Sequence, residues 1–150
     1  MDANRIEVSV EIARTPDVIW PVLIDVQRWP EWTPSVTAVE RVDRAPFGIG
    51  SRARVRQPGL KTMVWEVSEF QPEKLFTWQT RSVGISVVAS HEIRKTERGS
   101  TVTLHVDQRG WLSALLRPFI GSITENYMNM EARGLKKRCE ALMTLTSLHL

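Results

Sequence analysis

The 150-residue chain has the composition of one globular domain, which we expect to span residues 1–150. Its 42% hydrophobic and 25% charged residues exclude an intrinsically disordered chain and a membrane-embedded one. Twenty basic and 17 acidic residues leave a net charge of +3, so the basic pI does not by itself indicate a nucleic-acid partner. No membrane span and no signal peptide is predicted, and we therefore expect a cytoplasmic protein.

The beginning of the chain predicts a strand followed by two short helices. Residues 5–12 alternate between apolar and polar side chains, which is typical of a half-buried strand. Thr15 and Pro16 then supply an N-cap and a first-turn proline, and the apolar residues that follow have helical spacing. Pro21 lies early enough in this helix to be tolerated or to bend it. Residues 29–32, with sequence WPEW, predict a second, very short helix or turn.

The middle of the chain alternates with a period of two and predicts strands only. Short connections rich in glycine and proline separate the alternating segments, which is typical of an antiparallel meander. The predicted strands span residues 35–43, 51–57, 62–70, 74–81, 85–95 and 100–109.

The last segment predicts one long amphipathic helix, because its apolar residues recur at spacings of three and four. Pro118 marks either the true start of this helix or a kink in it. The recurring positions are Leu112, Leu116, Phe119, Ile123, Tyr127, Met130 and Gly134.

The order of these elements predicts an α+β fold. A doubly wound parallel sheet is excluded, because strands and helices do not alternate after residue 32. A seven-stranded antiparallel sheet with one apolar face needs a cover, and only the C-terminal helix is large enough to provide it. The sheet must therefore curl around that helix, which leaves space for a pocket at one end.

Five segments resemble the helix-grip superfamily known as SRPBCC, which includes START lipid-transfer domains, birch-pollen-type allergens and bacterial polyketide cyclases. They are TPDVIW (15–20), WPEW (29–32), FGIGS (47–51), GSTVT (99–103) and GLKKRCE (134–140). The resemblance covers nearly the whole chain, with its polyketide cyclase/dehydratase-like branch as the nearest part. It implies a curved seven-stranded sheet, two short helices after the first strand and a long C-terminal helix. It also implies binding, carrying or cyclising of apolar and aromatic molecules. We expect no cofactor.

The sequence offers an aromatic wall for such a pocket. Trp65 shares a strand face with Val67, and Phe76 and Trp78 share a face of the next strand. If these faces line the concave side, they oppose the apolar stripe of the C-terminal helix. A fully packed core is the alternative interpretation. The candidate ligand-binding residues are Trp32, Trp65, Phe76, Trp78, His91, Phe119, Ile123, Tyr127 and Met130.

His91 and Tyr127 are the candidate polar anchors, and the candidate catalytic residues if the protein is an enzyme. His91 alternates in phase with Ala89 and Ile93, which places it toward the apolar interior. There a neutral imidazole is able to hydrogen-bond a ligand hydroxyl or carbonyl, or simply a neighbour in the core. Both interpretations stay open.

Other chemistries are disfavoured. The motif formed by Gly48, Gly50 and Ala53 fits the dinucleotide fingerprint in spacing, but a strand follows it instead of a helix. The three histidines lack the spacing of a metal site. The single cysteine, Cys139, excludes an internal disulfide, and it lies late in a helix, where the dipole disfavours a thiolate.

Arg52, Arg54 and Arg56 project from one face of a predicted strand. They form either a solvated outer face, which we favour because no aromatic residue interleaves with them, or a stripe that binds phosphates.

Three functions follow from the sequence. The leading hypothesis is a binding domain for a small apolar molecule. The second is a polyketide cyclase or dehydratase in which His91 or Tyr127 moves a proton. The third, a module that binds nucleic acid or protein through the arginine strand, is disfavoured, and we expect no nucleic-acid partner. The chain is expected to be a monomer or a homodimer.

Overall fold

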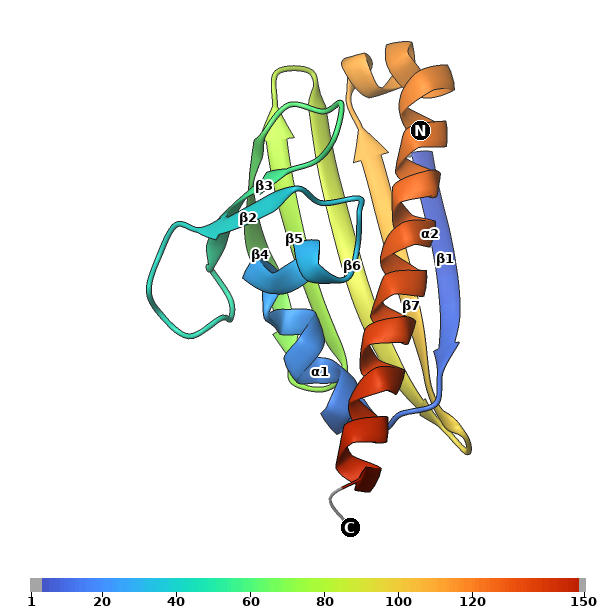
Figure 1. Ribbon diagram of the computed structural model, residues 1–150. Helices are drawn as coiled ribbons and strands as arrows, with labels where there is room; N and C mark the ends of the chain where they lie inside the picture. Colours follow the sequence, from blue (N-terminus) through green and yellow to red (C-terminus); the bar gives the residue numbers. More distant parts are fainter. Residues whose placement is uncertain (1–3, 149–150) are drawn as a thin grey trace.

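The computed structural model describes the backbone of residues 4–148 and the side chains of residues 5–142. It shows one antiparallel sheet, two short helices and a long C-terminal helix (Figure 1). This arrangement confirms the predicted α+β helix-grip fold. The elements are β1 (Asn4–Ile12), α1 (Pro16–Ile24), the 3₁₀ helix η1 (Val26–Glu31), β2 (Ala38–Arg41), β3 (Arg52–Arg56), β4 (Met63–Gln71), β5 (Leu75–Ser82), β6 (Ile85–Thr96), β7 (Gly99–Arg109) and α2 (Trp111–Leu148).

The sheet is a meander that β1 extends at one edge. Its order is β1-β7-β6-β5-β4-β3-β2, so each strand from β2 to β7 pairs with the next one along the chain. Every pair is antiparallel. Val8 lies opposite Leu104 and Val10 opposite Val102, which puts the apolar residues of both strands on one face. That face turns toward α2 (Figure 1).

The strand predicted over residues 35–43 is wrong in length, because β2 covers only Ala38–Arg41. The Thr33 hydroxyl lies 2.7 Å from the Ser35 hydroxyl and accepts a hydrogen bond from the Ser35 backbone N–H at 3.3 Å. Such local bonds from threonine to its own neighbours replace ladder bonds and delay the start of the strand.

Helix α2 begins at Trp111, so Pro118 lies inside the helix and does not start it. The first turns run across the end of the sheet before the helix descends along β7 and β1 (Figure 1). A proline inside a helix removes one N–H donor and favours a kink, which fits this change of direction.

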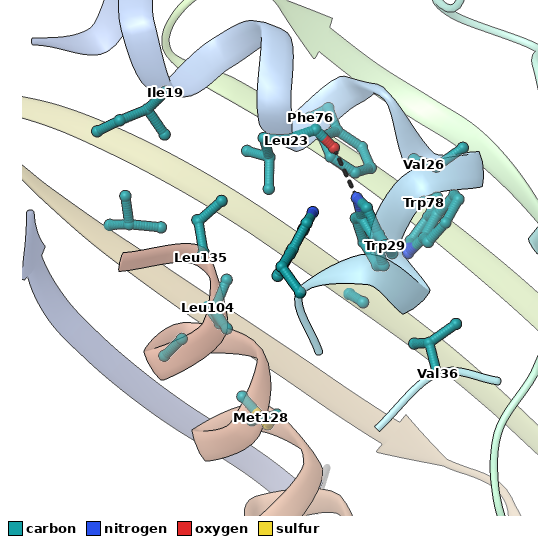
Figure 2. Packing of buried hydrophobic residues seen from close by; sticks show 14 of the residues in the cluster. Ile19, Leu23, Val26, Trp29, Val36, Phe76, Trp78, Leu104, Met128 and Leu135 are labelled. Carbon is teal, nitrogen blue, oxygen red and sulfur yellow. Dashed lines mark hydrogen bonds between the residues drawn. The ribbon is translucent and has the colours of Figure 1, made fainter. Parts of the chain in front are cut away.

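The core is richest in aromatic side chains below η1 (Figure 2). The indole of Trp29 lies at its centre, and its Nε1 donates a hydrogen bond to the Leu23 carbonyl at 2.9 Å. Its ring is 5.3 Å from that of Trp78 and 6.4 Å from that of Phe76, measured between centroids. These tilted contacts fill the space between η1 and the sheet.

A glycine allows α2 to pack closely against the end of η1. A Cβ atom added to Gly134 would lie 1.9 Å from the Trp32 carbonyl oxygen, so only glycine permits this contact. The close approach fixes the lower half of α2 against both η1 and the sheet.

Candidate functional site

The concave face of the sheet is covered at one end and open at the other. Cross-strand register puts Val67 opposite Trp78 and Trp65 opposite the buried Ala53, so these side chains all point inward. Burial falls from Val67 to Met63 on β4 and from Ala89 to Ile85 on β6, toward the end where α2 begins, whereas Thr80 of β5 and Gln108 of β7 are buried there. The buried inward residues are Val67, Ala89, His91 and Ile93, and the partly exposed ones are Met63, Trp65, Ile85 and Val87. The partly exposed set forms the open end of the concave face.

His91 lies on β6 with its ring buried in the concave face. The ring stacks on Phe76, with centroids 4.2 Å apart and an angle of 12° between the planes. Its Nδ1 lies 3.3 Å from the Phe76 carbonyl oxygen, and its Nε2 lies 3.2 Å from Oε1 of Glu131 on α2. The inward orientation predicted for His91 is therefore confirmed.

Glu131 is a polar group of the site that the sequence analysis missed. Its Oε1 is buried and accepts no aligned hydrogen bond from the described residues, although His91 lies within ion-pair distance. Both ring nitrogens of His91 face oxygen atoms, so satisfying both contacts requires one proton more than a neutral imidazole and a carboxylate hold together. The pair is thus able to accept a hydrogen bond from a further donor. A signal existed: Glu131 follows Tyr127 by four residues and interrupts an apolar helix stripe.

Trp32 follows η1 directly and packs against α2. Its indole Nε1 is buried and has no hydrogen-bond partner among the described residues. Gly134, one helical turn after Glu131, packs against the Trp32 backbone. The unused donor of Trp32 therefore lies at the contact between α2 and the end of η1.

The Tyr127 hydroxyl is not free in this structure. It donates a hydrogen bond to the Pro58 carbonyl oxygen in the turn between β3 and β4. This bond links α2 to the far side of the sheet across the open end. The oxygen of the hydroxyl remains able to accept a hydrogen bond.

The aromatic wall is present, but most of it is packed core. Phe76 and Trp78 are buried beneath Trp29, so the packed-core alternative describes them. Trp65 stays partly exposed, with its ring 5.6 Å from that of Trp78. The sequence placed residues 29–32 in a short helix without showing that Trp29 fills the concave face.

The helix stripe meets the wall only in part. Tyr127 and Met130 are half-buried, and Ile123 is 37% exposed. Phe119 does not face the wall as expected, because its side chain is 71% exposed. The reason is length: the 38 residues of α2 span about 57 Å, whereas the 11 residues of β7 span about 37 Å. The first turns of the helix therefore extend past the sheet.

Arg41 is a second polar residue on the inner side that the sequence analysis did not single out. It lies opposite the buried Ala53, and its guanidinium stands 5.4 Å above the Phe47 ring. It also bonds to the Asp43 carboxylate at 2.7 Å. The backbone N–H of Arg52 and the Arg41 side chain hold the pKa of Asp43 below its ordinary value. These contacts organise the loop from β2 to β3 through one terminal nitrogen of the guanidinium, whereas its buried Nε has no hydrogen-bond partner among the described residues.

The remaining candidates lie outside the concave face. The arginines of β3 are exposed, and Arg54 pairs with Glu40 at 2.8 Å, as expected of a solvated outer face. His105 also lies on the outer face, beside Arg5 and Glu7. Burial raises the pKa of the Cys139 thiol to about 12, so a thiolate is not available at neutral pH.

Two clefts open at the opposite end of the sheet. One, of about 480 Å³, lies between β1, the β6–β7 turn and Lys136. The other, of about 630 Å³, lies between Pro16, the β4–β5 turn and the end of β6. Charged side chains line much of both, which does not fit an apolar ligand. No group of three metal-ligating side chains occurs among the described residues.

The chain belongs to the family described as polyketide cyclase / dehydrase and lipid transport, which it matches over residues 3–143. This finding confirms the resemblance to the SRPBCC superfamily. Among curated proteins, it is 37% identical over 51 residues to uncharacterized proteins of Mycobacterium bovis and Mycobacterium tuberculosis. The alignment covers 34% of this chain and 30% of those relatives.

Solved structures show the same fold at low sequence identity. The Zhui aromatase/cyclase from Streptomyces sp. R1128 has a TM-score of 0.76 and 14% identity, with 93% of this chain and 94% of that chain covered. TTHA0849 from Thermus thermophilus has a TM-score of 0.74 and 17% identity, with 94% and 99% covered. Ginseng major latex-like protein 151 from Panax ginseng has a TM-score of 0.74 and 14% identity, with 91% and 97% covered. At these identities the likeness shows the fold alone.

Proposed function

We propose that this protein binds a small apolar molecule carrying at least one hydroxyl or carbonyl group. The ligand lies at the open end of the concave face, between Trp65 of β4 and the helix stripe from Ile123 to Glu131. Trp65 supplies a flat apolar wall, and Tyr127, His91 and Glu131 supply the polar contacts. The observation that carries the proposal is the loss of burial along the inward faces of β4 and β6 toward this end.

Family membership supports the same class of ligand, since the family is described by polyketide chemistry and lipid transport. The packing of Trp29 limits where a ligand fits, because it fills the space below η1. The ligand therefore approaches the His91–Glu131 pair from the side of Tyr127 and not from η1.

Native mass spectrometry of freshly purified protein tests the proposal directly, because a copurifying small molecule reveals its class by mass. A fluorescence titration measures the affinity of the protein for a hydrophobic dye. Competition by the copurified molecule then gives the affinity for that molecule. Trp65→Ala is expected to weaken dye binding about tenfold, since most of the flat wall is lost. Trp111→Ala, which removes an exposed tryptophan outside the concave face, is the matched control. Non-saturable binding, or equal effects of both variants, contradicts the proposal.

The contact between His91 and Glu131 favours a second candidate, a polyketide cyclase or dehydratase. In this reaction class a buried base removes a proton from the carbon between two carbonyl groups and returns it to an oxygen. The His91–Glu131 pair holds a proton acceptor in a site shielded from water. Incubation with a poly-β-ketone, followed by chromatography, tests it. Turnover that is unchanged in both His91→Gln and Glu131→Gln excludes the assignment.

A further inference from the structure

The end of the molecule where α2 begins exposes large apolar side chains. Trp111, Leu115 and Phe119 follow one another at a spacing of four and are 66%, 67% and 71% exposed. Val83, in the turn between β5 and β6, is 82% exposed. The Leu112 N–H donates to the Gly84 carbonyl at 2.8 Å, which joins this turn to the start of α2. We call Val83, Trp111, Leu115 and Phe119 the apolar tip.

The segments that form the apolar tip carry basic side chains and no acidic ones, and the nearest carboxylates along the chain are Asp107 and Glu125. Three segments meet at this end, residues 56–63, 80–86 and 108–124, and they contain no aspartate or glutamate. None of their basic side chains forms an ion pair with any residue that the structure describes. These side chains are Arg56, Lys61, Arg81, Arg109 and Arg117, all of them exposed.

We propose that the apolar tip docks this protein onto an anionic lipid bilayer. Apolar and aromatic side chains that project from a helix, with arginine and lysine around them, match the acyl boundary and the headgroups of such a membrane. A second copy of the chain is a poor partner, because the same positive charges would face one another. Docking is peripheral, since no helix among the described residues is long and apolar enough to cross a bilayer.

The apolar tip connects with the concave face. Phe119, Ile123 and Tyr127 lie at intervals of four on α2, so they form one helix stripe that leads from the tip to the Pro58 turn. Exposure falls along it from 71% at Phe119 to 37% at Ile123, and Tyr127 is half-buried. If the proposed ligand site is right, its ligand is a molecule that partitions into lipid bilayers. The docking surface itself does not depend on the ligand site.

Cosedimentation with vesicles tests docking. The protein is mixed with vesicles of phosphatidylcholine alone or of phosphatidylcholine with about 30% phosphatidylglycerol, an anionic lipid that gives the surface a negative potential. Binding is expected only to the anionic vesicles and is expected to weaken with salt. Trp111 provides a second readout, because its emission should shift to the blue on insertion. Trp111→Phe keeps an apolar ring at this position but removes the indole emission, so the blue shift should be lost.

Two double variants separate the apolar and the charged contributions. Leu115→Ser with Phe119→Ser is expected to reduce partitioning at least about tenfold, since two inserted side chains are lost. Arg109→Glu with Arg117→Glu is expected to reduce it at least about 25-fold, from roughly fivefold for each basic residue. Ile49→Ser and Arg94→Glu are the matched controls, because both residues are exposed and lie away from the tip.

Wild-type binding that both double variants lose and both controls keep supports the proposal. Equal binding to neutral and anionic vesicles, or no difference between the double variants and the controls, overturns it. A wild-type dimer in light scattering that Leu115→Ser with Phe119→Ser converts to a monomer, without vesicle binding, also overturns it and assigns the tip to self-association. Dye binding in solution is measured on the same variants, so failure of the ligand site is distinguished from failure of docking.

Discussion

Glu131 places a carboxylate in a mostly buried position with incomplete hydrogen bonding. Its carboxylate is mostly buried, and Oε1 receives no aligned hydrogen bond from the described residues. Burying a charge without full compensation is costly, and natural proteins accept such costs at functional sites. We expect Glu131→Gln to raise the free energy of unfolding by about 1 kcal/mol and to weaken binding of a ligand hydroxyl. Urea unfolding of this variant beside Glu125→Gln, an exposed control on the same helix, measures the effect. A loss of stability would instead mean that the pair with His91 is a net stabilising contact.

Replacing Gly134 by alanine is expected to destabilise the protein, although helix propensity alone predicts that it stabilises it. Alanine is favoured over glycine in a helix by about 1 kcal/mol. However, an added Cβ would lie 1.9 Å from the Trp32 carbonyl oxygen, which is backbone and cannot move aside. Gly134→Ala should therefore destabilise the protein by about 1–3 kcal/mol through overpacking. Thermal unfolding checks this, and Ser122→Ala, at an exposed position of α2, should not destabilise.

At the scale of elements, a carboxylate joins the lower half of α2 to the end of β1. Glu140 accepts hydrogen bonds from the Ala13 backbone N–H at 3.0 Å and from Lys136 Nζ at 2.9 Å. The Ala13 N–H, more than Lys136, holds the pKa of Glu140 below its ordinary value. A lowered folded-state pKa gives stability that is present above the unfolded-state pKa and is lost as pH falls through the folded value. Glu140→Gln should thus be less stable than wild type at pH 7.

The pH dependence distinguishes this ionic contribution from a loss of packing. The difference in melting temperature between wild type and Glu140→Gln should shrink as the pH falls below about 4.5, the ordinary value of a glutamate. Calorimetry between pH 7 and strongly acidic pH measures it, with Glu125→Gln as the exposed control. A difference that is constant across the range would contradict an ionic origin.

The elements themselves were predictable from local patterns. Alternation and turn residues place the strands, and the spacing of apolar residues places α2, because these signals depend only on near neighbours. The inward orientation of His91 follows from the same alternation. Local patterns do not show how elements of different length fit together. The exposure of Phe119 depends on how far α2 extends past the sheet, and the pairing of His91 with Glu131 depends on the register between α2 and β6.

At the scale of the whole molecule, Trp29 decides how much of the concave face is available. It projects from η1 into the space that the curved sheet and α2 enclose, beside Phe76 and Trp78 (Figure 2). Its ring also contacts those of Trp32 and His91. The fold supplies an enclosed space, and this one side chain fills a large part of it. The residue at this position therefore sets how much of the enclosed space is free.

Trp29→Ala tests this view. Removing the indole should lower the free energy of unfolding by about 3–5 kcal/mol and leave an apolar cavity beneath η1. A cavity with apolar walls binds a matching apolar molecule, and a ligand that binds only the folded state restores stability. Indole should therefore raise the melting temperature of Trp29→Ala by more than that of wild type or Trp111→Ala. If indole has no effect on Trp29→Ala, the core has collapsed around the missing ring, and Trp29 is not what limits the space.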